Sequence, residues 1–394
     1  MVGSNFDAYY ETPRIWFEKG NQPDEYGAFY TGGRFDGING FAPQTGMNEM
    51  GLTFSRLASP TPEKELKVKP NKKQITNPTN YLKSILHKCK TIDEVKTFIS
   101  QYDHSFFIND VFIYVEPSGR YLIVEPDTMS IGNDAKYVLA NFCPSTTDLK
   151  SVKQERYIKG VAFRGNITDT SIAFCTALSD TMHVCRKKIG DGTLLTIIRD
   201  IDEGIIYLYF YHDFKHLLTF NLKDELKKGD HFYEVPTIFP PNAEFKKLLD
   251  YKIPQNNRAI LSFMIFCGGL FLFSAAFFII DYFIKRKSIS YSSVKPLIIV
   301  TGLLLVFYML ILTANRNIFY FDAPYKDYKF SIFDVAAYIP YLMLLIIIPV
   351  LFTNVKIIRE NKWQWFSKYL LTMNSVSYII LMLLFTYWGF YSIF

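Results

Sequence analysis

Long apolar runs set the C-terminal third of the chain apart from the rest. Four segments are long enough and poor enough in charge to cross the hydrocarbon core of a bilayer, which takes about 20 helical residues. They cover about residues 259–284, 297–313, 335–353 and 369–388. Pro340 and Pro349 fall in the third segment, where a helix packed in a bundle tolerates them. The pattern predicts an all-α transmembrane bundle within residues 251–394.

Shorter apolar stretches separated by turn residues characterise residues 1–250. Stretches rich in Val, Ile, Tyr and Phe predict β-strands at 27–33, 51–57, 110–117, 120–126, 136–142 and 204–212. Apolar residues at three-to-four spacing predict helices at 79–89, 91–103 and 169–183. Thr91 followed by Glu94 is the capping-box pattern that begins a helix. This mixture favours an α+β domain in which helices flank paired sheets.

Charge is divided unevenly between the two parts. From Arg258 onward the chain carries 12 Lys and Arg against 5 Asp and Glu, whereas the first 257 residues carry 31 against 32. The first part therefore lacks the basic surface that nucleic-acid binding needs, and we expect no nucleic-acid partner. The excess positive charge belongs to the apolar part, whose expected partner is the lipid bilayer.

The loops between the apolar segments predict an orientation. The first and third loops hold eight basic residues: Lys285, Arg286, Lys287, Lys295, Lys356, Arg359, Lys362 and Lys368. The opposite side holds four: Arg258, Arg316, Lys326 and Lys329. Because basic loops stay in the cytoplasm, we expect a multi-pass membrane protein whose residues 1–250 form an extracytoplasmic domain.

Few residues suggest transport or metal chemistry. Asp281 and Asp334 are the candidate intramembrane charges, and both lie at predicted helix ends, which favours an anchor over a pore. The six histidines are scattered, and neither a Gly-rich phosphate loop nor an HExxH or GxSxG motif is present. We therefore expect no metal ion and no cofactor.

Several short motifs in the first part occur in a set order. They are GSNFD at 3–7, RIWF at 14–17, GMNEMGL at 46–52, VLANF at 138–142 and YLYFYHDFKHLLTFNL at 207–222. Together they resemble the linear-amide C–N hydrolases, N-terminal-nucleophile enzymes that include choloylglycine hydrolases, penicillin V acylases and the peptidase C45-like isopenicillin N acyltransferases. The resemblance covers about residues 2–240 and implies a four-layered αββα sandwich.

The resemblance implies a thiol mechanism and assigns residues to it. In this family an N-terminal cysteine attacks the amide carbonyl while its own α-amino group acts as the base. Asp7 matches the aspartate that holds this amine, and Asn141 matches the asparagine whose side-chain amide binds the oxyanion. Asn5 and Trp16 are candidates for contacts with a small-molecule amide substrate. Other roles stay open: a turn for Asp7, a strand-end cap for Asn141 and core packing for Trp16.

The chain also departs from the family pattern. Ser4 stands where the family often has Arg or Asn, and Arg186 is only a guess for the arginine that some members use near the nucleophile. No cysteine precedes Asn5, so the nucleophile and the first strand of the sandwich are missing, and the chain as given is expected to be inactive. A lost first strand would expose backbone on its neighbour, and an exported domain needs a signal. A start inside a longer gene product is therefore favoured over loss of catalysis.

Three functions remain for testing. The first is a membrane-anchored hydrolase or acyltransferase of linear, non-peptide C–N amide bonds. The second is a non-catalytic, membrane-tethered ligand-binding or sensor module, that is, a pseudoenzyme. The third, a transport-related bundle with a regulatory domain, needs polar residues inside the helices, and those are scarce.

Overall fold

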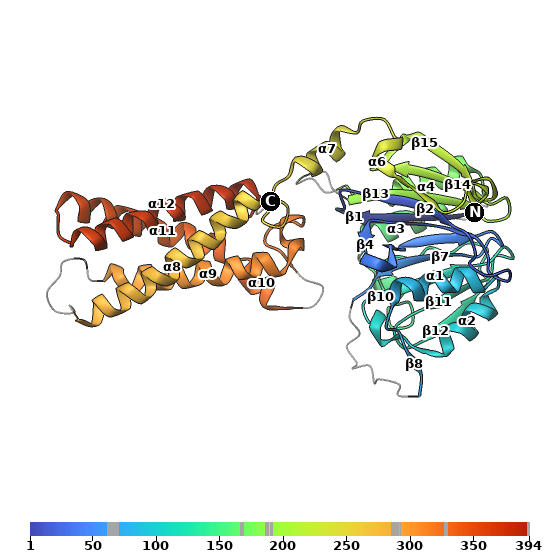
Figure 1. Cartoon of the computed structure of the whole chain (residues 1–394), viewed down its shortest axis with the longest axis horizontal. Helices are drawn as coiled ribbons and strands as arrows, with labels where there is room; N and C mark the ends of the chain where they lie inside the picture. The colour runs from blue at the N-terminus through green and yellow to red at the C-terminus, as the bar shows by residue number, and fades with distance from the viewer. Residues whose placement is uncertain are drawn as a thin grey trace. The chain divides into compact units, whose positions relative to one another are not determined.

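The chain forms two compact units, Met1–Leu249 and Asp250–Phe394 (Figure 1). The structure, a computed structural model, describes residues 1–60, 71–165, 169–185, 189, 192–284, 291, 293–326 and 330–391. Arg186 and the loop residues Lys285, Arg286, Lys287 and Lys329 lie outside the described residues. The same holds for residues 61–70.

The first unit contains two main antiparallel sheets. The eight-stranded sheet has the order β12 (Met129–Gly132), β11 (Tyr121–Val124), β10 (Asp110–Val115), β7 (Thr53–Ala58), β6 (Thr45–Asn48), β3 (Ala28–Gly32), β2 (Arg14–Glu18), β16 (His231–Glu234). The four-stranded sheet has the order β1 (Val2–Ala8), β13 (Gly192–Asp200), β14 (Ile205–Phe210), β15 (Asp213–Asn221). Two short pairs complete the strands: β4 (Arg34–Phe35) with β5 (Phe41–Ala42), and β8 (Lys73–Gln74) with β9 (Tyr102–Asp103).

Helices cover the outer faces of these sheets, giving a helix–sheet–sheet–helix order in Figure 1. On the eight-stranded sheet lie α1 (Pro78–Lys88) and α2 (Ile92–Ser100). On the four-stranded sheet lies α4 (Ile172–Thr181), which packs against α3 (Glu155–Arg164). Shorter helices are α5 (Leu222–Lys227), α6 (Val235–Ile238), α7 (Ala243–Asp250) and the 3-10 turns η1 (Gly37–Asn39), η2 (His104–Phe107) and η3 (Leu149–Ser151). The three longer helices predicted from the sequence are thus present, and the mixed α/β fold is confirmed.

A buried arginine joins the two sheets face to face. Arg199 of β13 is fully buried and donates hydrogen bonds to the Phe54 carbonyl (3.0 Å) and to Ser55 Oγ (3.1 Å) of β7. It also donates to Thr45 of β6 and to Ser4 Oγ of β1 (3.0 Å). Among the described residues these partners are neutral, and burial lowers the pKa of Arg199 to about 9.

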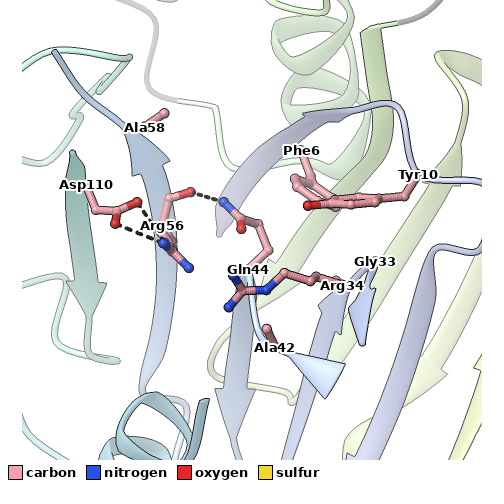
Figure 2. A pocket seen from close by; sticks show the side chains of 10 residues that line it. Phe6, Tyr10, Gly33, Arg34, Ala42, Gln44, Arg56, Ala58 and Asp110 are labelled. Atoms are coloured by element: carbon pink, nitrogen blue, oxygen red, sulfur yellow. Dashed lines mark hydrogen bonds and ion pairs between the residues drawn. The ribbon is translucent and has the colours of Figure 1, made fainter. Parts of the chain in front are cut away.

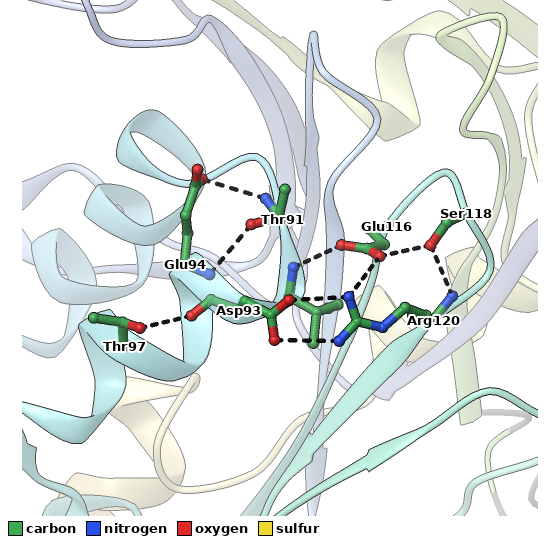
Figure 3. A network of polar contacts seen from close by, with 8 residues as sticks. Thr91, Asp93, Glu94, Thr97, Glu116, Ser118 and Arg120 are labelled. Atoms are coloured by element: carbon green, nitrogen blue, oxygen red, sulfur yellow. Dashed lines mark hydrogen bonds and ion pairs between the residues drawn. The ribbon is translucent and has the colours of Figure 1, made fainter.

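The start of α2 shows why the local sequence specifies a helix there. The Thr91 hydroxyl accepts a hydrogen bond from the Glu94 amide, and the Glu94 carboxylate accepts one from the Thr91 amide, so the predicted capping box is confirmed. Glu116, between β10 and β11, accepts a hydrogen bond from the Ile92 amide (2.8 Å) and belongs to the polar network drawn in Figure 3. The capping interactions thus also tie the helix to its sheet.

One predicted strand is wrong. Five of the six predicted strands are present, but the segment expected at 136–142 is irregular. Its apolar side chains Tyr137 and Leu139 pack against Val111 and Tyr121 on the side of the sheet that faces away from α1 and α2. The apolar residues that predict a strand here instead cover one face of a sheet, so tertiary packing overrides β-propensity.

The second unit contains four helices that are long and apolar enough to cross a membrane. They are α8 (Arg258–Ile284), α9 (Val294–Ala314), α11 (Ile339–Arg359, preceded by α10, Ile332–Ala336) and α12 (Trp365–Tyr387); η4 (Arg316–Phe319) lies in a loop. Pro340 occupies the first turn of α11, where its missing N–H leaves no helical bond unmade. Asp334 caps α10 with Ser331, and Asp281 is buried against Lys295 (2.7 Å), so neither carboxylate stands alone.

Candidate active site

An irregularity in β1 directs Asp7 towards α3. Along the strand Ser4 and Phe6 face the eight-stranded sheet, while Asn5 contacts α4. The register with β13 shifts between Phe6 and Asp7, where Leu194 is the extra residue. Such bulges re-aim side chains and are frequent beside active sites.

Asp7 is held by two donors from different elements. Thr193 Oγ1 of β13 donates to one carboxylate oxygen (2.7 Å), and the guanidinium of Arg156 of α3 donates to the other. The Asp7 side chain is 17% exposed and that of Arg156 27%, so both are accessible to a ligand. A carboxylate accepts about four hydrogen bonds, which leaves Asp7 capacity for a further donor such as an amine.

Asn141 is joined to Asp7 by the same guanidinium. A second nitrogen of Arg156 donates to Asn141 Oδ1, and Asn141 Nδ2 donates to the Ala58 carbonyl (2.8 Å). Gln154, which precedes α3, donates to the Asn141 carbonyl (2.8 Å). One N–H of the Asn141 amide therefore remains for another acceptor. The structure thus brings together the two residues that the resemblance assigns to catalysis.

Arg156 was not among the site residues predicted from the sequence. The local feature that could have pointed to Arg156 is its place in the first turn of α3. The helix dipole disfavours a cation there, so a carboxylate partner is expected to offset this unfavourable interaction. That signal required knowing where α3 begins.

A cavity of about 200 Å³ lies beside these residues (Figure 2). Phe6 and Tyr10, whose ring centroids are 6.1 Å apart, line one side. On the other side Arg56 forms a two-pronged ion pair with Asp110 (2.7 and 2.9 Å). The lining also includes Gly32, Gly33, Arg34, Ala42, Gln44 and Ala58. The cavity adjoins the site through Phe6, the neighbour of Asp7, and Ala58, the partner of Asn141.

The two predicted substrate contacts are placed differently. Asn5 donates to the Ser179 carbonyl of α4 (2.9 Å) and accepts from Thr196 (2.8 Å), so most of its hydrogen-bonding capacity is used within the fold. Trp16 is 3% exposed and stacks on Tyr30 (5.6 Å) in the core under α1. Neither is in the cavity lining. A substrate contact by either residue stays a prediction, and core packing accounts for Trp16.

Burial disfavours the thiolate form of two cysteines in the first unit. Cys143 is two residues from Asn141, and burial raises its pKa. Burial likewise raises the pKa of Cys89 to about 12. Within the described ranges no group of three His, Cys, Asp or Glu side chains is placed to hold a metal ion. The arrangement therefore offers a carboxylate, an amide and a guanidinium at the edge of a cavity.

Comparison with known proteins finds similarity in structure only. No family model and no curated protein sequence matches the chain. An arginine variant of the conjugated bile acid hydrolase from Clostridium perfringens has a TM-score of 0.44 and 15% identity, over 61% of this chain and 95% of that chain. A cysteine variant of the same enzyme has a TM-score of 0.41 and 14% identity, over 61% and 92%. At this level of similarity, the residues of this chain must carry any inference about function.

Proposed function

We propose that the protein is a membrane-anchored hydrolase or acyltransferase of linear, non-peptide C–N amide bonds. The observation that carries the proposal is the bridge by Arg156 between Asp7 and Asn141, at the edge of a cavity. Those two residues were selected by motif alone, from segments 134 positions apart in the sequence. A chance pair of motif matches has no reason to share one guanidinium.

The roles follow from the chemistry of amide cleavage. Asp7 would orient and charge-stabilise the α-amino group of an N-terminal cysteine, which takes the thiol proton and later protonates the leaving amine. The remaining N–H of Asn141 would donate to the oxyanion as the tetrahedral intermediate forms. Arg156 would hold both side chains and offset the negative charge that develops between them.

The nucleophile itself would come from a strand that precedes Met1. β1 is an edge strand of the four-stranded sheet among the described strands, so its outer side is available for pairing. A strand paired there runs beside Asp7 and could deliver a cysteine to it. The extracytoplasmic location of this unit is part of the same proposal, and its support is the loop charge described above.

The decisive experiment begins with the longest reading frame that contains this chain. The mature protein is purified in detergent, its N-terminus is sequenced, and it is incubated with a thiol-reactive probe and a panel of N-acyl amines and N-acyl amino acids. We expect one N-terminal cysteine that the probe labels, and amide turnover that Asp7→Asn removes. Absence of an in-frame cysteine followed by a strand would disprove the catalytic function.

The alternative is a non-catalytic ligand-binding module tethered to the membrane. It is favoured by the raised pKa of Cys143, the cysteine nearest in sequence to the site, because such a thiol is a poor nucleophile. This function predicts that members of the same panel bind to the longest form without being cleaved. Isothermal calorimetry together with product analysis separates the two.

A further inference from the structure

A short hairpin carries apolar side chains out into solvent. It consists of β4 and β5, joined by η1, and Phe35 is 65% exposed while Ile38 is 103% exposed. Phe41 of β5 contacts Phe35 (ring centroids 5.6 Å apart) and Phe232 of β16 (5.5 Å), which is itself 51% exposed. These four side chains, Phe35, Ile38, Phe41 and Phe232, are called the hairpin patch below. Contiguous exposed apolar surface of this kind marks an interaction site.

The fold holds the hairpin in this position. Thr79 Oγ1, in the first turn of α1, donates to Asp36 (2.5 Å), and Asn77 Nδ2 donates to Asn39 Oδ1 (2.7 Å). Across the hairpin the Asp36 amide donates to the Gly40 carbonyl (2.7 Å). The exposure of Ile38 is therefore imposed by hydrogen bonds to a helix.

Arginines border the patch. The guanidinium of Arg14 lies over the rings of Phe41 (4.4 Å) and Phe232 (5.7 Å). Arg34 is exposed and makes no hydrogen bond or ion pair with the residues described here. The pKa of Asp36 is lowered, first by the hydrogen bond from Thr79 and then by the charge of Arg34, and these effects outweigh desolvation, which raises it. Aromatic and aliphatic groups beside a guanidinium suit the boundary between acyl chains and phosphate headgroups.

We propose that the hairpin patch docks on the surface of the lipid bilayer that the four helices of the second unit enter. The first unit ends at Leu249 and α8 begins at Arg258, and nine residues of extended chain span at most about 30 Å. The covalent connection therefore keeps the C-terminal end of the first unit within about 30 Å of the start of α8. Arg34 is the exposed cation of the hairpin and complements phosphate headgroups. The acidic groups beside the patch are both engaged: Asp36 accepts from Thr79, and Glu234 pairs with Arg14 (2.7 Å).

Docking would also determine how ligands reach the cavity. Arg34 and Ala42 belong to the hairpin and line the cavity, as Figure 2 shows. A hairpin at the lipid surface would place that rim beside the headgroups, so that an amphiphilic ligand with a chain in the bilayer could enter without crossing water. The inference rests on the membrane localisation in the proposed function and does not need amide cleavage.

The test uses the full chain reconstituted in vesicles of phosphatidylcholine and phosphatidylglycerol. Cys175 and Cys185, the two cysteines that are not buried, are first replaced by serine. An environment-sensitive fluorophore is then attached to Ile38→Cys or, as the matched control, to Ile131→Cys. Ile131, 40% exposed, lies on β12 at one edge of the eight-stranded sheet, whereas β16, which carries Phe232 of the patch, forms the other edge. Seven strand spacings, or about 34 Å, separate β12 from β16. Neither side chain belongs to the buried core, so both variants are expected to fold.

We expect spin-labelled acyl chains to remove at least half of the fluorescence at position 38 and to leave position 131 unchanged. Equal quenching at both positions, or none at position 38, would overturn the proposal. Concentration-dependent protection of position 38 in lipid-free detergent would overturn it in favour of a second copy as the occupant. Protease protection of the spanning helices in the same vesicles checks insertion separately, so a failure of the localisation is distinguishable from a failure of docking.

Discussion

The carboxylate of Asp7 is ion-paired with the guanidinium of Arg156, which lies 149 residues further along the chain. The pair connects β1 of the four-stranded sheet to α3. Through the second nitrogen of Arg156 it also fixes Asn141, whose own segment has no strand partner. The site therefore depends on one cation that holds two otherwise separate segments.

Replacing Arg156 tests this arrangement. Arg156→Gln removes the charge opposite Asp7, and we expect a loss of about 100-fold in kcat/KM in the amide-cleaving form, typical of losing one electrostatic contact to a transition state. Hydrogen exchange at Phe142 should become faster whether or not the protein is active. Arg156→Lys should recover less than half of the loss in activation free energy, because an ammonium cannot bridge two acceptors as a guanidinium does.

Lys159→Gln is the matched control for Arg156, since Lys159 lies on the same helix and pairs with the exposed Glu155 (2.6 Å). It should leave both activity and exchange unchanged. Normal exchange and normal activity in Arg156→Gln would contradict the bridging role.

Arg199 provides a test of how the two sheets are joined. Arg199→Ala removes the buried hydrogen bonds that the guanidinium donates to Thr45, Ser55 and the Phe54 carbonyl, and we expect a loss of about 3 kcal/mol or more in stability. Arg199→Met also removes the buried charge and retains volume, so it should cost less. Thermal unfolding in detergent, with hydrogen exchange along β13, measures both variants.

Arg120, which pairs with Asp93 at the surface, serves as the comparison for Arg199. Arg120→Ala should hardly move the unfolding midpoint. Equal destabilisation by Arg199→Ala and Arg120→Ala would show that the buried hydrogen bonds contribute nothing special.

Glu18 and His87 predict a pH window for stability. Burial raises the pKa of Glu18, but hydrogen bonds from His87 and Lys83 outweigh it and the net pKa is lowered from 4.5. Burial lowers the pKa of His87, but its contact with Glu18 (3.6 Å) and its hydrogen bond to the Tyr26 carbonyl raise the net pKa above 6.5.

The direction of the pH effect follows from these shifts. The Glu18 contribution is complete above pH 4.5 and is lost as pH falls through its lowered pKa, whereas the His87 contribution is complete below pH 6.5 and is lost as pH rises through its raised pKa. Glu18→Gln should therefore destabilise the protein most between pH 4.5 and 6.5. Chemical denaturation across this range measures the effect, and a difference independent of pH would refute it.

The buried pair of Asp281 and Lys295 joins α8 to α9. Lys295 is 1% exposed, and removing either charge leaves the other buried and unpaired, at a cost of about 3–5 kcal/mol. Asp281→Asn and Lys295→Met should each lower the melting temperature in detergent. Exchanging the two residues, Asp281→Lys with Lys295→Asp, should recover part of the loss; no recovery would mean that the charges do not interact.

The proposed orientation is testable with a native cysteine. Cys185 is exposed on the first unit, and Asn361 lies in the loop between α11 and α12. A membrane-impermeant thiol reagent added to intact cells should label Cys185 and spare Asn361→Cys made in a Cys185→Ser background. Opposite labelling would place the first unit in the cytoplasm, and permeabilised cells provide the control for accessibility.

The sequence by itself determined the features that depend on neighbouring residues. Four helices were predicted close to their observed positions, because some 20 consecutive apolar residues suffice to identify a membrane-spanning helix. α2 was predicted with its capping box, since Thr91 and Glu94 satisfy backbone groups within one turn. Asp7 and Asn141 were selected by motif, which requires no knowledge of distance.

Only the tertiary structure decided what depends on contacts between distant segments. The stretch around Asn141 has strand-like residues yet covers a sheet as an irregular segment, because its apolar side chains pack on Val111 and Tyr121. Trp16 belongs to the core under α1, and Asn5 contacts α4. No local sequence pattern distinguishes these packing roles from a role in substrate binding. Arg156 became recognisable only when the fold placed it between Asp7 and Asn141, because an ion pair across 149 residues leaves no trace in the local sequence.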